Sequence, residues 1–193
     1  MHRLLITLSL LVFVCFNQLT AQTAENKIPA YPNPKGVSAP FAGFIGDWLI
    51  VYGGCNFPDT PAAQGGTKVY YAEGYALNTA DTDAQWIKLP DLPEAVAYGA
   101  TVSTGNKLYC LGGMNSKSSL KSVYEIRLDT LTKQFSVHQG TSLPVSIDNA
   151  SATTDGQFLY ISGGNQGNND QALYAYPTQG KGKWIKLADY PGP

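Results

Sequence analysis

Polar side chains follow three glycine pairs in this chain, and their types and spacing suit the binding of a polar ligand. Asn56, Asn115 and Asn165 each lie one or two residues beyond such a pair. An asparagine amide both donates and accepts hydrogen bonds, so these side chains could bind the hydroxyl groups of a ligand. Asparagine also suits turns and left-handed backbone, which is the alternative interpretation at each position.

Two further candidates stand where we expect strands to begin. Tyr98 precedes Gly99, and its ring could stack on a cyclic ligand, although packing in the core is the favoured interpretation. Asp148 occupies, with Asn149, the corresponding junction of the next repeat, where its carboxylate could contact a ligand or form a turn. The predicted ligand-binding residues are therefore Asn56, Tyr98, Asn115, Asp148 and Asn165.

Other kinds of chemistry have no pattern in this sequence. It contains no Ser-His-Asp, phosphate-loop or zinc-ligand spacing, so we predict no catalytic residue, no metal and no cofactor from the residues alone. Glu125 and Arg127 alternate on one face of an expected strand, which is typical of a solvated charge pair. His138 has no second histidine near it in the sequence, so it cannot belong to a histidine cluster.

The candidates are positioned by a unit that recurs about every 50 to 60 residues. In each unit an apolar run ends in a glycine pair, and an aromatic residue and then Leu-Pro or Tyr-Pro follow. The glycine pairs are at 53–54, 112–113 and 163–164, and the aromatic residues are Trp86, Phe135 and Trp184. Because the aromatic residues recur in register, we expect them to belong to the cores of the units.

Short apolar or alternating runs bounded by Gly, Asn, Asp and Pro predict antiparallel strands throughout. In the second unit the strands are expected at 100–103, 108–111, 122–128 and 134–137. The third strand of the first unit is expected to hold Tyr70, Tyr71 and Tyr75. A long insert at 56–68 precedes it, and insertions on one face of a repeat array often lie at the binding face.

Repeats of this kind form β-propellers, in which ligands bind at the mouth of a central channel. We therefore predict an all-β propeller with blades at roughly 36–97, 98–148 and 149–193. Propellers have about four to eight blades, so three four-stranded blades would be a partial propeller, about half of a six-bladed ring. Its two open edges could pair with another copy, so we expect self-association.

The start of the chain and its charge bear on location and partners. A basic start, an apolar run from Leu4 to Phe16 and small residues beyond it predict a signal peptide at 1–22. The protein is then expected to be exported, periplasmic or secreted, with no membrane attachment after cleavage. The formal net charge is −1, and Arg127 is the only arginine beyond the signal peptide, so we expect no nucleic-acid partner.

Two cysteines remain beyond the signal peptide, Cys55 and Cys110. An oxidising compartment would allow them to form a disulfide. We favour two buried, unpaired thiols, which behave as small apolar side chains.

Glycine pairs followed by an aromatic residue and Leu-Pro resemble Kelch repeats. More narrowly, the chain resembles the cyclically permuted mutarotase group of the N-acetylneuraminate epimerases, also called sialic acid mutarotases. Segments 36–44, 49–54 and 98–99 are similar to the later blades of those enzymes, whereas 182–187 and 190–193 are similar to an early blade. The resemblance covers nearly all of the chain beyond the signal peptide.

This resemblance implies an isomerase that interconverts the α and β anomers of sialic acid, and so a small sugar as the ligand. One group must take a proton from the anomeric hydroxyl, and another must give one to the ring oxygen. The family's suspected pair is a glutamate after a repeat glycine and an arginine six residues on, and this sequence has no such pair. We therefore expect a truncated chain that lacks the catalytic blade. The alternative is a non-catalytic Kelch module that binds a glycan or a protein.

Overall fold

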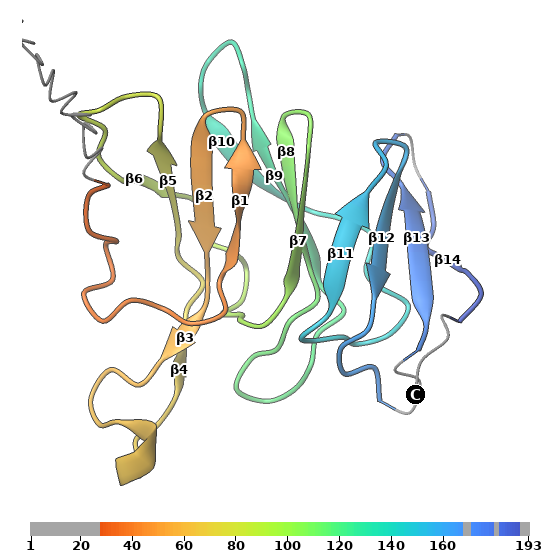
Figure 1. The fold of residues 1–193 in the computed structure, drawn as a ribbon, viewed down its shortest axis with the longest axis horizontal. Coiled ribbons are helices and arrows are strands. Elements are labelled where there is room, and N and C mark those ends of the chain that lie inside the picture. Colours follow the sequence, from red (N-terminus) through yellow and green to blue (C-terminus); the bar gives the residue numbers. More distant parts are fainter. Residues whose placement is uncertain (1–27, 168–170, 180–181, 190–193) are drawn as a thin grey trace, which may run out of the picture.

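The computed structural model describes residues 28–167, 171–179 and 182–189, so the signal peptide predicted at 1–22 lies outside it. The described strands form three four-stranded antiparallel sheets and one two-stranded hairpin (Figure 1). Within these ranges the helical content is a single 3-10 turn, η1 (Ala62–Gln64). No helix in the described part of the chain is long and apolar enough to cross a membrane. The predicted all-β architecture with three four-stranded blades is confirmed.

Each blade runs from an inner to an outer strand. Blade 1 contains β1 (Phe41–Ile45), β2 (Trp48–Tyr52), β5 (Gly74–Asn78) and β6 (Ile87–Leu89). Blade 2 contains β7 (Ala100–Thr104), β8 (Lys107–Leu111), β9 (Val123–Leu128) and β10 (Phe135–Gln139). Blade 3 contains β11 (Ser151–Thr154), β12 (Phe158–Ser162), β13 (Leu173–Pro177) and β14 (Ile185–Lys186).

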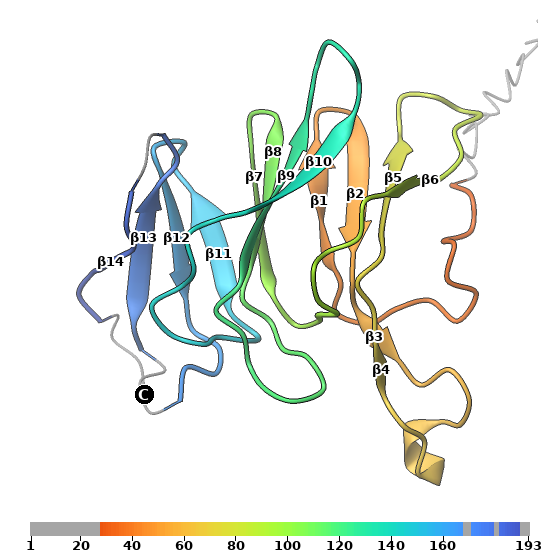
Figure 2. The same ribbon diagram turned by 180° about the vertical axis from the view of Figure 1, so that it is seen from behind.

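The blades stand side by side with their inner strands in contact. β7 contacts both β1 and β11, so the inner strands form the middle of the molecule (Figure 1). Figure 2, seen from behind, shows the outer strand β10 in front of them and β6 beside β5 at the edge of blade 1. All inner strands begin at one end of the blades, and β2, β8 and β12 end there. The loops that leave those strands and the connections between blades therefore gather at a single end, which we call the mouth end.

The insert of the first unit forms a separate hairpin at the mouth end. β3 (Cys55–Asn56) pairs with β4 (Val69–Tyr70), with η1 between them. The expectation that Tyr70 and Tyr71 belong to the third blade strand is therefore wrong, because that strand begins at Gly74, whereas Tyr75 does belong to it. The backbone N–H of Tyr71 bonds to the carbonyl of Gly54, next to a left-handed glycine pair, so the chain leaves the blade ladder at this point.

Two apolar cores lie between the blades. Blades 1 and 2 enclose one core, and blades 2 and 3 enclose the other. Strand β8 serves both, because Leu108 and Cys110 face the first core while Tyr109 and Leu111 face the second. Successive side chains of a strand point to opposite faces, so a strand buried on both sides is apolar at every position. This explains the unbroken apolar runs in front of the glycine pairs.

The glycine pairs join each blade to the connection that follows it. Gly112 has a φ of +61°, and a Cβ added to it would lie 2.3 Å from the carbonyl oxygen of Ile147. Gly53 has the same geometry against Val96, also at 2.3 Å. Only glycine allows both the left-handed backbone and this close approach. Packing between blades therefore requires glycine at both of these positions.

The repeated aromatic residues hold the outer strands to the chain of the preceding connection. The Trp184 indole N–H donates to the carbonyl of Thr141 at 2.9 Å, and Trp86 donates to Pro29 in the same way at 2.9 Å. Trp184 also packs against the core between blades 2 and 3, as expected for a core residue. These contacts show that the two tryptophans stabilise the fold.

Replacing Trp184 with phenylalanine should lower the free energy of unfolding by about 1–2 kcal/mol, because one hydrogen bond and part of the ring contact are lost. Urea denaturation measures this. Tyr160→Phe in the same blade is the control, since that hydroxyl bonds only to the exposed turn residue Asp155, and it should leave the midpoint nearly unchanged. Equal losses in both variants would contradict the structural role of the indole.

Candidate functional site at the mouth end

The five predicted ligand-binding residues all lie at the mouth end. Asn56 is in β3 of the hairpin, and the other four are on loops or in the connections that enter blades 2 and 3. Three isolated β-bridges, Ser38 with Cys55, Ala97 with Met114 and Asp148 with Asn165, occupy the same place in successive blades. Cys55, Met114 and Asn165 are therefore structurally equivalent. Asn56 and Asn115 lie one residue later, where the third blade has Gln166. The three asparagines are thus not one repeated set, although the sequence places each of them just after a glycine pair.

Asn56 and Asn115 are engaged by the protein itself. The Asn56 amide donates to the carbonyl of Gly36 at 2.6 Å and accepts the Tyr71 hydroxyl at 2.7 Å. The Asn115 side-chain oxygen accepts the backbone N–H groups of Lys117 and Ser118 at 2.8 and 3.0 Å, which is the hydrogen bonding of an Asx turn. These contacts agree with the turn interpretation, and ligand contact by the two residues stays a prediction.

Asp148 is the centre of a polar cluster at the junction of blades 2 and 3. The residue is only 3% exposed. The Asn149 and Asn165 amides donate to one carboxylate oxygen at 2.6 and 2.7 Å, and the Ser119 hydroxyl donates to the other. Ser119 belongs to the loop after β8, and Asn165 to the loop after β12. One carboxylate therefore holds two mouth loops together, and Asn165, which bonds to it, is an exposed residue.

Tyr98 lies between blades 1 and 2 and is half-buried. It has a φ of +62°, as Ala39 and Asn149 have 50° and 54° at the same place in their own blades. The Tyr98 N–H donates to the Ala39 carbonyl at 2.9 Å, and the Asn149 N–H donates to the Tyr98 carbonyl at 2.7 Å. Left-handed backbone is costly for a non-glycine residue, and here it is compensated by this ladder across three blades. The ladder places the Tyr98 side chain at the mouth.

The hairpin insert brings a cation to Tyr98. The Lys68 ammonium donates to the Tyr98 hydroxyl oxygen at 2.9 Å and lies 5.0 Å from the centre of the Tyr98 ring. The Cys55 thiol lies 3.4 Å from the same hydroxyl. Lys68 was not among the residues predicted from the sequence. The one signal that could have found it is its place at the end of an insert on the binding face.

Tyr70, also on the insert, lies near both charges of the mouth. The pKa of its hydroxyl is raised, chiefly by burial, although the Lys68 ammonium acts to lower it; Asp148 is among the groups that raise it. The mouth therefore has a cation from blade 1, two phenols and, at the junction of blades 2 and 3, amides that bond to a buried carboxylate. These groups donate and accept hydrogen bonds, which suits a polar, hydroxyl-rich ligand.

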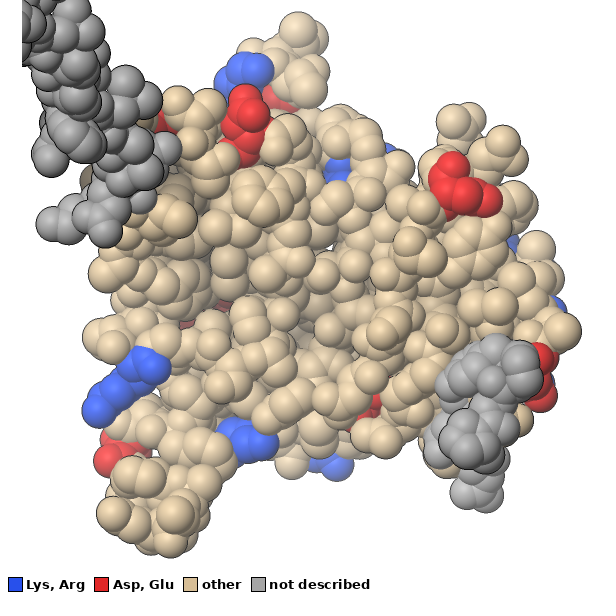
Figure 3. Space-filling view, viewed as in Figure 1, with Lys and Arg blue, Asp and Glu red and all other residues tan. Residues whose placement is uncertain are grey.

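The ion pair of Glu125 and Arg127 lies away from this site, and neither Cys55 nor Cys110 forms a disulfide. Arg127 pairs with Glu125 at 2.6 Å, at the opposite end of blade 2 from its glycine pair. Cys55 and Cys110 are both buried and unpaired, which confirms the favoured interpretation. Burial raises the pKa of the Cys110 thiol. Figure 3 shows the charged side chains of this face as separate spots on a mostly uncharged surface.

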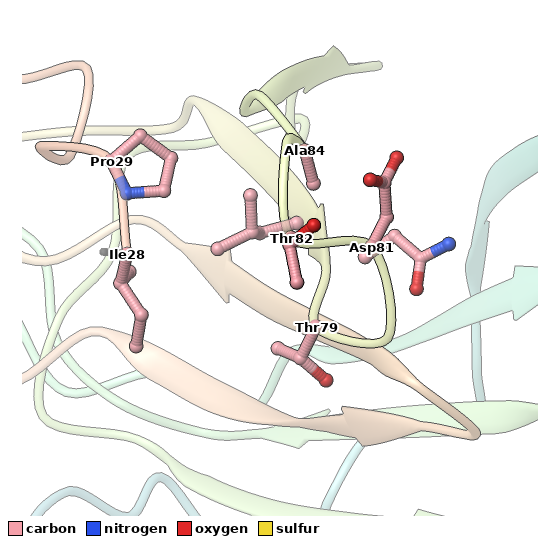
Figure 4. Close-up of a pocket in the computed structure, with 8 residues that line it drawn as sticks. Ile28, Pro29, Thr79, Asp81, Thr82 and Ala84 are labelled. Carbon is pink, nitrogen blue, oxygen red and sulfur yellow. The ribbon is translucent and has the colours of Figure 1, made fainter. Parts of the chain in front are cut away.

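A pocket of about 100 Å³ lies away from the mouth, at the outer side of blade 1 (Figure 4). Ile28 and Pro29 face Thr79 and Thr82 across it, and the lining is mostly apolar. Its one charged lining residue is Asp81, on the loop after β5. Acid–base chemistry needs more than a single carboxylate, so we assign no reaction to this pocket.

Known proteins share the repeats and the fold. Residues 95–137 match the Kelch motif. The N-acetylneuraminate epimerase of Haemophilus influenzae (strain 86-028NP) is 32% identical over 128 residues, covering 58% of this chain and 33% of that protein. The N-acetylneuraminate epimerase of Salmonella typhi is 28% identical over 94 residues, covering 46% and 24%. The chain thus spans about a third or less of the length of these curated relatives.

A solved structure, that of YjhT, has the same fold. It matches with a TM-score of 0.66 at 19% identity, covering 86% of this chain and 55% of YjhT. The match extends across the described blades. The protein is therefore a Kelch-repeat β-propeller chain that resembles the N-acetylneuraminate epimerases.

Proposed function

We propose that this protein binds N-acetylneuraminate at the mouth end and belongs to a sialic acid mutarotase system that interconverts its α and β anomers. The observation that carries this is the similarity to N-acetylneuraminate epimerases over 128 residues. The polar mouth supports it, because a sugar offers hydroxyl groups to both the donors and the acceptors found there.

We infer that the proton-transfer pair lies outside this chain. Anomer interconversion needs a base at the anomeric hydroxyl and an acid at the ring oxygen. The sequence has no Gly-Glu followed by an arginine at the family's spacing, and in the described structure Arg127 lies at the end of blade 2 opposite the mouth. The same observation favours a second candidate, a non-catalytic Kelch module that binds a glycan or a protein.

Export and self-association are part of the proposal. The apolar run near the start of the chain supports a signal peptide, which fractionation of expressing cells would test. The exposed side chains of Phe44, on an inner strand, and Ile185, on an outer one, are 50% and 49% exposed and support association through the free faces of blades 1 and 3. Light scattering after size-exclusion chromatography measures it, and a monomer at all concentrations would contradict it.

The decisive experiment follows freshly released α-N-acetylneuraminate by proton NMR with and without the purified protein. Saturation transfer from protein to sugar in the same sample reports binding. We expect binding without acceleration above the buffer rate, because the mouth recognises the sugar and the catalytic pair is elsewhere. The Haemophilus influenzae epimerase is the positive control for rate. Acceleration would place a catalytic pair within this chain, and absence of binding would overturn the proposed function.

A further inference from the structure

Lys68 is a cation held at the mouth by an uncharged partner. Its ammonium group bonds to the Tyr98 hydroxyl at 2.9 Å and lies 5.7 Å from the centre of the Phe57 ring. The ion pairs formed within the described residues are those of Lys88, Lys107, Arg127 and Lys186. Lys68 is in none of them, so its charge is not neutralised by a carboxylate of the described chain.

The hairpin fixes the position of this charge. Lys68 directly precedes β4, whose Val69 and Tyr70 pair with Asn56 and Cys55 of β3. The Cys55 end of the hairpin is bridged to Ser38 in the connection that enters blade 1. The ammonium is therefore carried by a paired segment and not by a free loop tip, and the Tyr98 contact holds it between blades 1 and 2.

The chemistry of the contact leaves Lys68 able to bind an anion. An ammonium group has three donor protons, and the structure shows one of its bonds, to the Tyr98 hydroxyl. That hydrogen bond also raises the pKa of Lys68, so the side chain stays charged at neutral pH. A cation in this state forms strong, charge-assisted hydrogen bonds with a carboxylate.

We infer that Lys68 is the group that selects acidic sugars, by binding the ligand's carboxylate at the blade 1 side of the mouth. This deepens the proposed function and rests on it. Asp148 lies toward blade 3, where a ligand carboxylate would be repelled and ligand hydroxyls would meet the Asn165 amide. The two charges therefore orient an acidic sugar, with its carboxylate on Lys68 and its hydroxyls toward Asn165.

Lys68→Met tests this, because it removes the charge and keeps an unbranched side chain over the rings. Binding is measured by NMR titration with N-acetylneuraminate, glucuronate and the neutral sugar N-acetylmannosamine. We expect the variant to bind both acidic sugars about tenfold more weakly, because a tenfold loss corresponds to one charged hydrogen bond in water-exposed surroundings. Its affinity for the neutral sugar should be unchanged. Lys68→Arg should restore most of the affinity. Raising the salt concentration should weaken the binding of acidic sugars to the wild type but not to Lys68→Met.

Lys117→Met is the matched control, since that lysine lies on the exposed loop after β8 and belongs to no ion pair in the described residues. It should bind all three sugars like the wild type. Equal loss for acidic and neutral sugars, or no loss in Lys68→Met, would overturn the inference. Glucuronate binding that depends on Lys68 without any binding of N-acetylneuraminate would overturn the proposed ligand and keep the role of Lys68. No binding of any acidic sugar to the wild type would overturn both.

Discussion

Alanine in place of Gly112 should lower the free energy of unfolding by about 3 kcal/mol, the largest single effect that we expect. Two costs combine in this variant. The φ of +61° is unfavourable for alanine, and the new Cβ would lie 2.3 Å from the Ile147 carbonyl oxygen, so the connection into blade 3 must move. Urea denaturation followed by tryptophan fluorescence measures the change.

Gly105→Ala is the control for backbone conformation alone. Gly105 has a φ of +57° in the turn between β7 and β8, and nothing lies within 4 Å of a Cβ added there. This variant should cost about 1 kcal/mol, the usual penalty for left-handed alanine. If both variants lose the same amount, close packing between the blades contributes nothing at Gly112, and our explanation of the glycine pairs is wrong.

Replacing Asp148 with alanine should cost about 2 kcal/mol and weaken sugar binding more than any other single change at the mouth. The buried carboxylate accepts from Ser119, Asn149 and Asn165, and its removal leaves these donors without their acceptor. The loops after β8 and β12 should then no longer be held in fixed positions relative to each other. Urea denaturation gives the stability, and hydrogen exchange at 163–167 reports the order of the second loop.

Two control variants separate these effects. Asp148→Asn keeps the shape and one acceptor oxygen, so its loss of stability should be clearly smaller than that of the alanine variant. Asp155→Ala removes another turn carboxylate of blade 3, which lies between β11 and β12 at the end opposite the mouth. It should leave sugar binding unchanged. Normal binding by Asp148→Ala would show that the cluster has no part in the site.

The mouth combines groups from all the described blades, so its chemistry depends on how the blades meet. Lys68 comes from the insert of blade 1, Tyr98 from the start of blade 2, and Asn165 from the loop after β12 in blade 3. The Tyr98 backbone is the link, because it bonds to Ala39 on one side and Asn149 on the other. A substitution that tilts one blade should therefore change binding without touching the ligand.

The sequence predicts the repeats, most of the blade strands and the end of the blades at which the candidates lie, although it does not predict the hairpin that contains Tyr70. In the second unit the expected strands differ from β7–β10 by at most two residues at any boundary. Local rules suffice here, because a strand buried on both faces is apolar throughout and a left-handed turn selects glycine. The same contacts repeat in each blade and select the same residue types, so the glycine pairs and aromatic residues recur in the sequence.

Tertiary structure alone decided which side chains meet. Asn115 and Asn165 look alike in the sequence, yet one closes an Asx turn and the other reaches Asp148 in the preceding connection. Lys68 has no motif, and it becomes part of the mouth only because the insert pairs as a hairpin that places it on Tyr98. Contacts between residues far apart in the chain depend on how the blades pack. No local sequence pattern encodes such contacts.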